Sequence, residues 1–338
     1  MSGSGRRGRR GGPIVREVDG DAFVYRRDGR RLTAVKEIAR IEALAIPPAW
    51  TDVRIARGPS AKVLARGIDA AGRTQMIYHP RFRQRREREK FARLGRFGSA
   101  LPKLRARVDR DLRRKRLGRE RVVACVIRLI DLEFFRVGNE EYAAKHGSYG
   151  VTTLREEHID ATASSVRFDF VGKSGKRHAR RVSDPRIARL ISRLEELPGD
   201  EVFRFFEDTG VSRQVRSKHV NAYVKRVMGE EFTARDFRTW GGSRLALSSL
   251  LEHDEDAFRT RTSAASAARD AVRAAADRLG NTPAVTKSSY IDPRVLALAD
   301  DPAARERLRK ARKKMRPQAH LSVDEQCLLA LLARRAPR

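Results

Sequence analysis

Cysteine is nearly absent from this chain of 338 residues, which contains two, Cys125 and Cys327. Two cysteines are too few for the disulfide framework of a small secreted domain or for a four-cysteine zinc site. Cys125 lies in the apolar run VVACVIRLI, where we expect a buried and unreactive thiol. The cysteine usage therefore favours a protein of a reducing compartment.

Long hydrophobic runs are missing as well, and no apolar stretch approaches the roughly 20 residues that cross a bilayer. The N-terminal stretch MSGSGRRGRRGGP has no apolar segment after its arginines, which argues against a secretory signal. It predicts instead a short disordered basic arm over residues 1–13. We therefore expect no membrane insertion and a cytoplasmic protein.

Neither a metal site nor a nucleotide-hydrolase loop is evident. The seven histidines are scattered without ligand spacing, and no pair of carboxylates accompanies them. The phosphate-binding pattern GxxxxGK[ST] does not occur. We therefore expect no metal and no cofactor, so any phosphoryl chemistry must depend on cations and a side-chain nucleophile.

Positive charge, by contrast, is abundant. The 74 lysines and arginines outnumber the 43 acidic residues and give a formal net charge of +31, spread over the whole chain. A compact body with that excess repels itself unless a polyanion is near, so nucleic acid is the leading partner and an anionic membrane is the rival. The length and the 40% hydrophobic content suffice for a real core and predict two domains.

Short β-type segments dominate residues 14–84. The runs AFVY, TDVRIA and KVLARGIDAAGRTQMIY alternate as strands do, with residues 69–72 as the turn of a hairpin. The segment AVKEIARIEALA predicts a short helix that ends before Pro47. We therefore expect a mainly β N-terminal domain over residues 14–84.

Helical periodicity dominates residues 85–338. The most apolar segment, RERVVACVIRLIDLEFFRVG, predicts the central core helix of this second domain. The segments TTLREEHID, SSVRFDFVG and KRHARRVS predict a small antiparallel sheet, and helices are expected again from Pro185 to the end, including the alanine-rich SAASAARDAVRAAADRL. The expected fold class is α+β, with a mainly β domain before a larger, mainly α domain.

Two segments place a cation where packing alone explains it poorly. Arg136 follows the apolar helix in LEFFRVGNEEY; considered alone, it is best explained as a cap of the helix C-terminus, with Gly138 and Asn139 closing that helix. The turn GKSGK lifts Lys173 and a second lysine to the tip of a hairpin. Those lysines either face solvent or reach a phosphate, and the sequence leaves both open.

Two further segments add cations and a phenol. Arg235 and Arg238 are three residues apart at the start of FTARDFRTWGGSRLALSSLL, so they share a face, while Trp240 turns toward the core. Two guanidinium groups on one face repel each other unless an anion lies between them, which favours a phosphate site. Tyr290 lies among small polar residues and a lysine, nine residues after Asn281. A tyrosine can form a phosphodiester with DNA and so conserve the energy of the broken bond.

Arg136 in FFRVGNEEY, Lys173 in FVGKSGK, Arg238 in RDFRTWG and Tyr290 in LGNTPAVTKSSYID resemble, in order and spacing, the motifs of type IB DNA topoisomerases of the small poxvirus and bacterial kind. The resemblance extends from about Gln75 to Tyr290. It implies a C-shaped clamp that closes around duplex DNA. It also implies a monomer that acts at the nucleoid without ATP or metal.

The resemblance implies a role for each motif residue. Tyr290 would attack a backbone phosphate, giving a 3′-phosphotyrosyl link and a free 5′-hydroxyl end. Arg136 and Arg238 would hold the nonbridging oxygens of the phosphate. Lys173 would protonate the leaving 5′-oxygen, and Arg235 would support that proton transfer.

Other positions match the family less closely. Poxvirus-type members carry histidine in place of Asn281, whose amide can still donate a hydrogen bond but adds no positive charge. Gln75 and Tyr78 fall where the β domain of the family touches DNA. Asn139 and Tyr142 fall on a short helix that enters the major groove in the family. Each of these four is equally explained as ordinary surface.

Two other functions stay open. A tyrosine recombinase shares the helical catalytic domain and the phosphotyrosine chemistry, but it usually carries histidine where this chain has Arg235, and it generally begins with a helical bundle. A noncatalytic nucleoid protein explains the charge but not the setting of Tyr290. The C-terminal segments RERLRKARKKMRP and SVDEQCLLALLARR are expected to close the clamp or to pack against the core.

Overall fold

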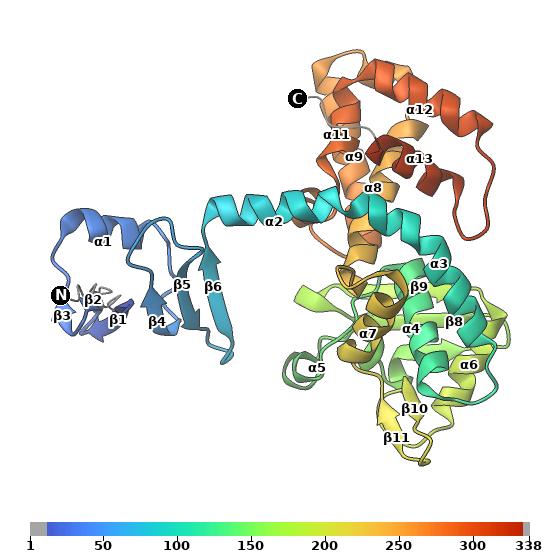
Figure 1. Cartoon of the computed structure of the whole chain (residues 1–338), viewed down its shortest axis with the longest axis horizontal. Coiled ribbons are helices and arrows are strands. Elements are labelled where there is room, and N and C mark those ends of the chain that lie inside the picture. The colour runs from blue at the N-terminus through green and yellow to red at the C-terminus, as the bar shows by residue number, and fades with distance from the viewer. Residues whose placement is uncertain (1–11, 334–338) are drawn as a thin grey trace, which may run out of the picture. The chain divides into compact units, whose positions relative to one another are not determined.

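The computed structural model describes residues 12–333 and divides the chain into two compact units, Met1–Lys90 and Phe91–Arg338 (Figure 1). The fold class is α+β, as predicted. The basic arm predicted at residues 1–13 lies outside the described residues except for its last two positions. The boundary expected after residue 84 falls inside helix α2 (Pro80–Ala92).

The first unit is built on an antiparallel sheet with the strand order β3-β2-β1-β4-β5-β6. Its elements are β1 (Ile14–Asp19), β2 (Ala22–Arg27), β3 (Arg30–Arg31), α1 (Val35–Glu42), β4 (Thr51–Ile55), β5 (Val63–Ile68) and β6 (Thr74–Tyr78). Ile14, Val53 and Ile55 form a small core with Ile41 of α1. The predicted hairpin is confirmed, since β5 and β6 pair on either side of residues 69–73.

The second unit is mainly helical and contains two small antiparallel sheets within its described residues (Figure 1). Its helices are α3 (Leu94–Leu112), α4 (Arg119–Glu133), α5 (Glu140–His146), α6 (Pro185–Glu195), α7 (Ser217–Met228), α8 (Ala234–Glu252), α9 (Arg261–Leu279), α10 (Pro283–Ser289), α11 (Pro293–Ala297), α12 (Pro302–Lys314) and α13 (Val323–Leu332). The sheets are β7 (Ile159–Ala161) with β8 (Val166–Val171) and β9 (Arg177–Val182), and β10 (Arg204–Phe206) with β11 (Ser212–Gln214).

Helix α4 is the central core helix, as its apolar sequence predicted. Val122 to Ile127, Leu129 and Ile130 are each at most 1% exposed. Cys125 is fully buried, as predicted, and burial raises the pKa of its thiol to about 12. Across residues 12–333, no helix has the length and apolar character needed to span a membrane.

Three local predictions are wrong. Strands β10 and β11 interrupt the stretch after Pro185 that was expected to be helical. Residues 151–153 and 156–158 form 3-10 turns, so the strand predicted in TTLREEHID is confined to its last two residues and Ala161. Helix α4 ends at Glu133 and is closed by Phe134, which has φ of 55°, rather than by Gly138 and Asn139.

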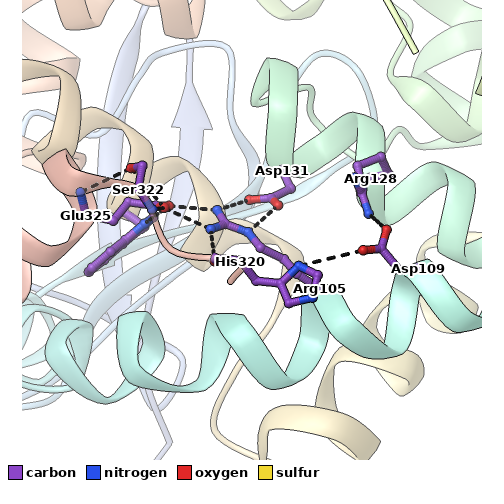
Figure 2. Close-up of polar contacts among 8 residues, drawn as sticks. Arg105, Asp109, Arg128, Asp131, His320, Ser322 and Glu325 are labelled. Atoms are coloured by element: carbon purple, nitrogen blue, oxygen red, sulfur yellow. Dashed lines mark hydrogen bonds and ion pairs between the residues drawn. The ribbon is translucent and has the colours of Figure 1, made fainter. Parts of the chain in front are cut away.

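Helix α13 is fixed to the core by a cluster of charges around Arg105 (Figure 2). The Arg105 guanidinium bonds both Asp131 oxygens at 2.7 and 2.9 Å and both Glu325 oxygens at 2.7 and 2.9 Å. Glu325 also accepts a 3.0 Å hydrogen bond from Trp240 Nε1 of α8. The C-terminal helix is therefore a packing element of the second unit, and the cluster ties it to α3, α4 and α8.

Candidate active site

A pocket of about 390 Å³ in the second unit gathers residues that are far apart in the sequence. All six residues predicted to take part in catalysis line it: Arg136, Lys173, Arg235, Arg238, Asn281 and Tyr290. A second lysine of the same turn, Lys176, lines it too. The four segments singled out in the sequence therefore meet at one place.

Arg136 lies beyond the end of α4 and faces the pocket, so the capping role that it suggests in isolation is wrong. The physical reason is the left-handed turn at Phe134, which ends α4 two residues before Arg136. Arg136 Nη2 donates a hydrogen bond to Asn281 Oδ1. Arg136 Nη1 and Asn281 Nδ2 are buried without a partner among the described residues, so two donors are left for a ligand.

Arg238 is held on α8 by main-chain carbonyl groups. Its Nη1 donates to the oxygen of Phe134 and its Nη2 to the oxygen of Leu279 at 2.8 Å, and the side chain is 3% exposed. Burial, reinforced by the charge of Arg136, lowers the pKa of Arg238 to about 10. The guanidinium therefore stays charged at neutral pH, and its neutral partners fix it without cancelling that charge.

Lys173 lies at the tip of the β8–β9 hairpin, as predicted. The N–H of Gly172 donates to the oxygen of Lys176 at 2.7 Å and closes the turn. Ser174 and Gly175 adopt positive φ values of 63° and 71°, which lets the chain reverse direction within three residues. Both lysines are exposed side chains that reach the rim of the pocket.

Tyr290 follows the last turn of α10, and α8 holds its backbone. The carbonyl of Tyr290 accepts a 3.3 Å hydrogen bond from Ser243 Oγ, which also accepts one of 2.9 Å from the N–H of Asp292. The Arg238 guanidinium lies 5.1 Å from the centre of the phenol ring. Burial raises the pKa of Tyr290, but the charges of Arg238 and Arg136 more than offset it, so the pKa lies below its ordinary value.

Sequence reasoning missed the glycines and the serine at the middle of α8. A side chain at Gly242 would come within 2.6 Å of the Tyr290 oxygen, and one at Gly241 within 2.2 Å of the Phe134 ring. Each glycine lets a neighbour of the pocket approach the helix. The sequence does mark these glycines, because glycine inside a helix costs about 1 kcal/mol relative to alanine and is therefore unusual there.

The pocket carries positive charge that no carboxylate balances. Of the described residues that line it, none is acidic. The five cations, Arg136, Lys173, Lys176, Arg235 and Arg238, take part in no ion pair among the described residues. Like charges held this close are stable when an anion lies between them, so the pocket suits a phosphate group.

The other predicted contacts lie outside this pocket. Asn139 caps α5, where its Oδ1 accepts the N–H of Tyr142 at 3.1 Å. In the first unit, Gln75 Nε2 bonds Asp69 at 2.8 Å and Tyr78 is 36% exposed at the end of β6. Contacts of these four residues with DNA stay predictions. Residues 12–333 contain no group of three or more His, Cys, Asp or Glu side chains that could hold a metal ion.

Comparison with known proteins places the chain in a family. Residues 79–316 match the family described as eukaryotic DNA topoisomerase I, catalytic core, and residues 22–69 match the bacterial DNA topoisomerase IB N-terminal domain. A DNA topoisomerase 1B of Acanthamoeba polyphaga mimivirus is 34% identical over 284 residues, which cover 82% of this chain and 84% of the relative. The DNA topoisomerase 1B of vaccinia virus, strain Copenhagen, is 20% identical over 77% of this chain and 81% of the relative. This chain belongs to the type IB DNA topoisomerases, a family of isomerases.

Proposed function

We propose that this chain relaxes supercoiled duplex DNA by cutting and resealing one strand through Tyr290. The observation that carries the proposal is a phenol of lowered pKa in a pocket with five cations and no acidic lining residue among those described. A phosphodiester supplies the missing negative charge. The names of the mimivirus and vaccinia relatives support DNA as the substrate.

In the cleavage step, Tyr290 Oη attacks the phosphorus and the bond from phosphorus to the 5′-oxygen breaks. The products are a 3′-phosphotyrosyl link and a free 5′-hydroxyl end. The lowered pKa of Tyr290 eases transfer of the phenolic proton to water before or during attack, and the phenol regains a proton from water after religation. Lys173 gives a proton to the leaving 5′-oxygen, a contribution of about 10²–10⁴-fold.

Arg136 and Arg238 stabilise the charge that develops on the nonbridging oxygens. Each has a buried nitrogen without a partner, Nη1 in Arg136 and Nε in Arg238. The Nδ2 of Asn281 is a third such donor, and its orientation is set because Oδ1 accepts from Arg136. Donors fixed before the substrate binds need little reorganisation during the reaction, which is the main source of electrostatic catalysis.

Religation reverses these steps after the free end has rotated. The 5′-hydroxyl attacks the phosphotyrosine, returns its proton to Lys173 and releases Tyr290. Since the covalent link conserves the energy of the broken bond, no nucleotide hydrolysis is needed. We expect the reaction to proceed without metal, with Arg235 supporting Lys173, and a monomer to carry it out.

The test is incubation of supercoiled plasmid with the protein in EDTA and without nucleotide. Relaxation is expected, together with a covalent protein–DNA complex trapped by detergent. Tyr290→Phe removes one hydroxyl and should abolish both while DNA binding persists. Relaxation by Tyr290→Phe at the wild-type rate would exclude this nucleophile.

The same assay separates the alternatives. A noncatalytic DNA-binding protein would shift the plasmid in a gel without relaxing it. A recombinase would need two DNA sites and would yield exchanged strands. Arg235, at the position where recombinases usually carry histidine, supports relaxation as the outcome.

A further inference from the structure

His178 lies behind the active-site pocket, and the proposed mechanism does not use it. The side chain belongs to β9 and is 4% exposed. Its ring stacks on Phe170 with 5.0 Å between centroids and an interplanar angle of 23°, and Phe135 meets it edge-on at 5.9 Å. Its Nδ1 is buried without a partner among the described residues. Ring packing, rather than a hydrogen bond from Nδ1, therefore fixes its orientation.

Two glycines contact the Nε2 end of this ring. A Cβ atom added to Gly172 would lie 2.8 Å from Cδ2 and Nε2 of His178, and one added to Gly280 would lie 2.5 Å from Cε1. Gly172 directly precedes Lys173, and Gly280 directly precedes Asn281. The imidazole therefore fills the space between the turn that carries the proposed general acid and the turn that carries the amide donor.

The same strand is tied to the end of α9 two residues further on. Arg180 Nη2 donates to the oxygen of Asp277 at 3.1 Å and to that of Arg278 at 3.4 Å. Glu133 at the end of α4 pairs with Arg278 at 2.8 Å. The ends of α4 and α9 are thus linked to each other and to β9 immediately behind the pocket. These bonds hold β9, which carries His178, at a fixed distance from the ends of α4 and α9.

We propose that His178 is a positioning residue that sets the distance between the Lys173 turn and the Asn281 turn, so that both reach one phosphate. This inference rests on the proposed function. Two elements that act on the same reacting group must be held accurately, since a displacement of about 1 Å can cost roughly 10²-fold in rate. The ring packs against the backbone of both turns, so its size sets the distance between them.

The charge state of the ring suits a spacer. Burial, with Arg136, Arg180 and Arg238 acting in the same direction, lowers the pKa of His178 to about 4. The ring is therefore uncharged at neutral pH and adds no charge to a pocket already rich in cations. A lysine or arginine of similar reach would increase the repulsion there.

The test removes the ring of His178, adds a methyl group at Gly172, and then combines the two changes. Gly172 has φ of −96° and ψ of −166°, which alanine adopts without strain, so the added methyl group meets only the ring and the turn. The proteins to compare are His178→Ala, Gly172→Ala and the double variant. The matched control is Gly118→Ala, whose φ of −78° and ψ of 170° are similar and whose added methyl would contact nothing within 4 Å. Single-turnover formation of the covalent complex at saturating DNA is measured with DNA affinity and thermal unfolding.

His178→Ala is expected to slow covalent-complex formation by about 10²-fold with DNA affinity nearly unchanged. Gly172→Ala should also be slow, because its methyl group pushes the Lys173 turn away from the ring. The double variant should be faster than Gly172→Ala, since the methyl group then occupies space that the ring has left. Gly118→Ala should match the wild type.

A substrate with sulfur at the 5′-bridging position separates a positioning defect from a general loss of fold, because a general loss of fold would slow cleavage of both substrates equally. Sulfur leaves without a proton, so displacement of Lys173 no longer slows the reaction, and His178→Ala should be impaired less on this substrate than on the ordinary one. The impairment that remains reports the displaced Asn281. His178→Ala that matches wild type on the ordinary substrate, or single effects that simply multiply in the double variant, would overturn the positioning role. Wild-type protein that forms no covalent complex would overturn the proposed function instead.

Discussion

Among single residues, Lys173 allows a direct test of the leaving-group chemistry. Lys173→Ala should slow cleavage of an ordinary phosphodiester by about 10²–10⁴-fold, because the 5′-oxygen then leaves without a proton donor. The 5′-bridging sulfur substrate should be cleaved nearly as fast by the variant as by wild type. The measurement is single-turnover cleavage of both substrates.

Lys176 provides the matched control for this experiment. It lies in the same turn and lines the same pocket, so Lys176→Ala removes an equal charge at nearly the same place. We expect Lys176→Ala to have a small and equal effect on the two substrates. Equal impairment of Lys173→Ala on both would show that Lys173 binds DNA and is not the proton donor.

Asn281 tests the value of a neutral donor in a charged pocket. Asn281→Ala should reduce cleavage by less than Arg136→Ala or Arg238→Ala, because charge-assisted hydrogen bonds are roughly twice as strong as neutral ones. Asn281→His should stay active and gain activity below a pH of about 6.5, where imidazole becomes charged. Covalent-complex formation measured across pH checks both expectations. An Asn281→Ala rate equal to that of wild type at every pH would remove Asn281 from the site.

The residues of the pocket were predictable mainly because the motifs around Arg136, Lys173, Arg238 and Tyr290 resemble, in order and spacing, those of a known family. Their chemistry alone was less decisive, since it favoured a helix cap for Arg136 and left a solvent-exposed role open for Lys173. Residues whose role is spatial left a weaker signal in the sequence: Gly241, Gly242, Ser243 and His178. Whether a glycine or a buried ring matters depends on which distant segment packs against it, and a single sequence does not contain that information.

Among elements, α13 offers a test of how the C-terminal helix supports the catalytic helix α8. Glu325→Gln keeps the shape and the acceptor for Trp240 but removes the charge that faces Arg105. We expect a loss of roughly 3 kcal/mol in the free energy of unfolding, at the low end for a broken buried pair because Asp131 still pairs with Arg105. Urea denaturation at neutral pH measures it.

Asp256→Asn is the matched control, since the Asp256–Arg259 pair is exposed and should contribute less than about 1 kcal/mol. The pH dependence gives a second check. Burial raises the pKa of Glu325, but the Arg105 hydrogen bonds outweigh it and lower the pKa from 4.5 to about 2. A depressed pKa stabilises the fold above about pH 4.5, and this contribution is lost as pH falls toward 2. The difference between wild type and Glu325→Gln should therefore shrink over that range, and a constant difference would contradict the assignment.

Elements with long, regular patterns were predicted, whereas the shortest strands of the second unit, β10 and β11, were not. The apolar run of α4 and the alanine-rich run of α9 are unambiguous over 15 and 19 residues. Strands β10 and β11 have three residues each, too few to establish an alternating pattern. The end of α4 was misplaced because a left-handed Phe134 depends on the room that Gly241 leaves for its ring, which is a tertiary effect.

For the whole molecule, the net charge of +31 predicts a steep salt response. The logarithm of DNA affinity should fall with the logarithm of salt concentration, with a slope of about −0.9 for each phosphate contacted. Contact with roughly six or more phosphates would lower affinity by about 10³-fold or more between 50 and 200 mM salt. Fluorescence anisotropy with a labelled duplex measures the slope. A flat response would argue against extensive contact with the DNA backbone.

The main-chain hydrogen bonds of Arg238 affect how this protein tolerates evolutionary change. A carbonyl oxygen is supplied by every residue type, so substitution of the side chain at Phe134 or Leu279 does not delete the acceptor that orients the guanidinium. A substitution at either position therefore leaves the acceptor in place as long as the path of the backbone is kept. Mutational robustness of this kind allows the position of the Arg238 guanidinium to be kept while the side chains around its acceptors change.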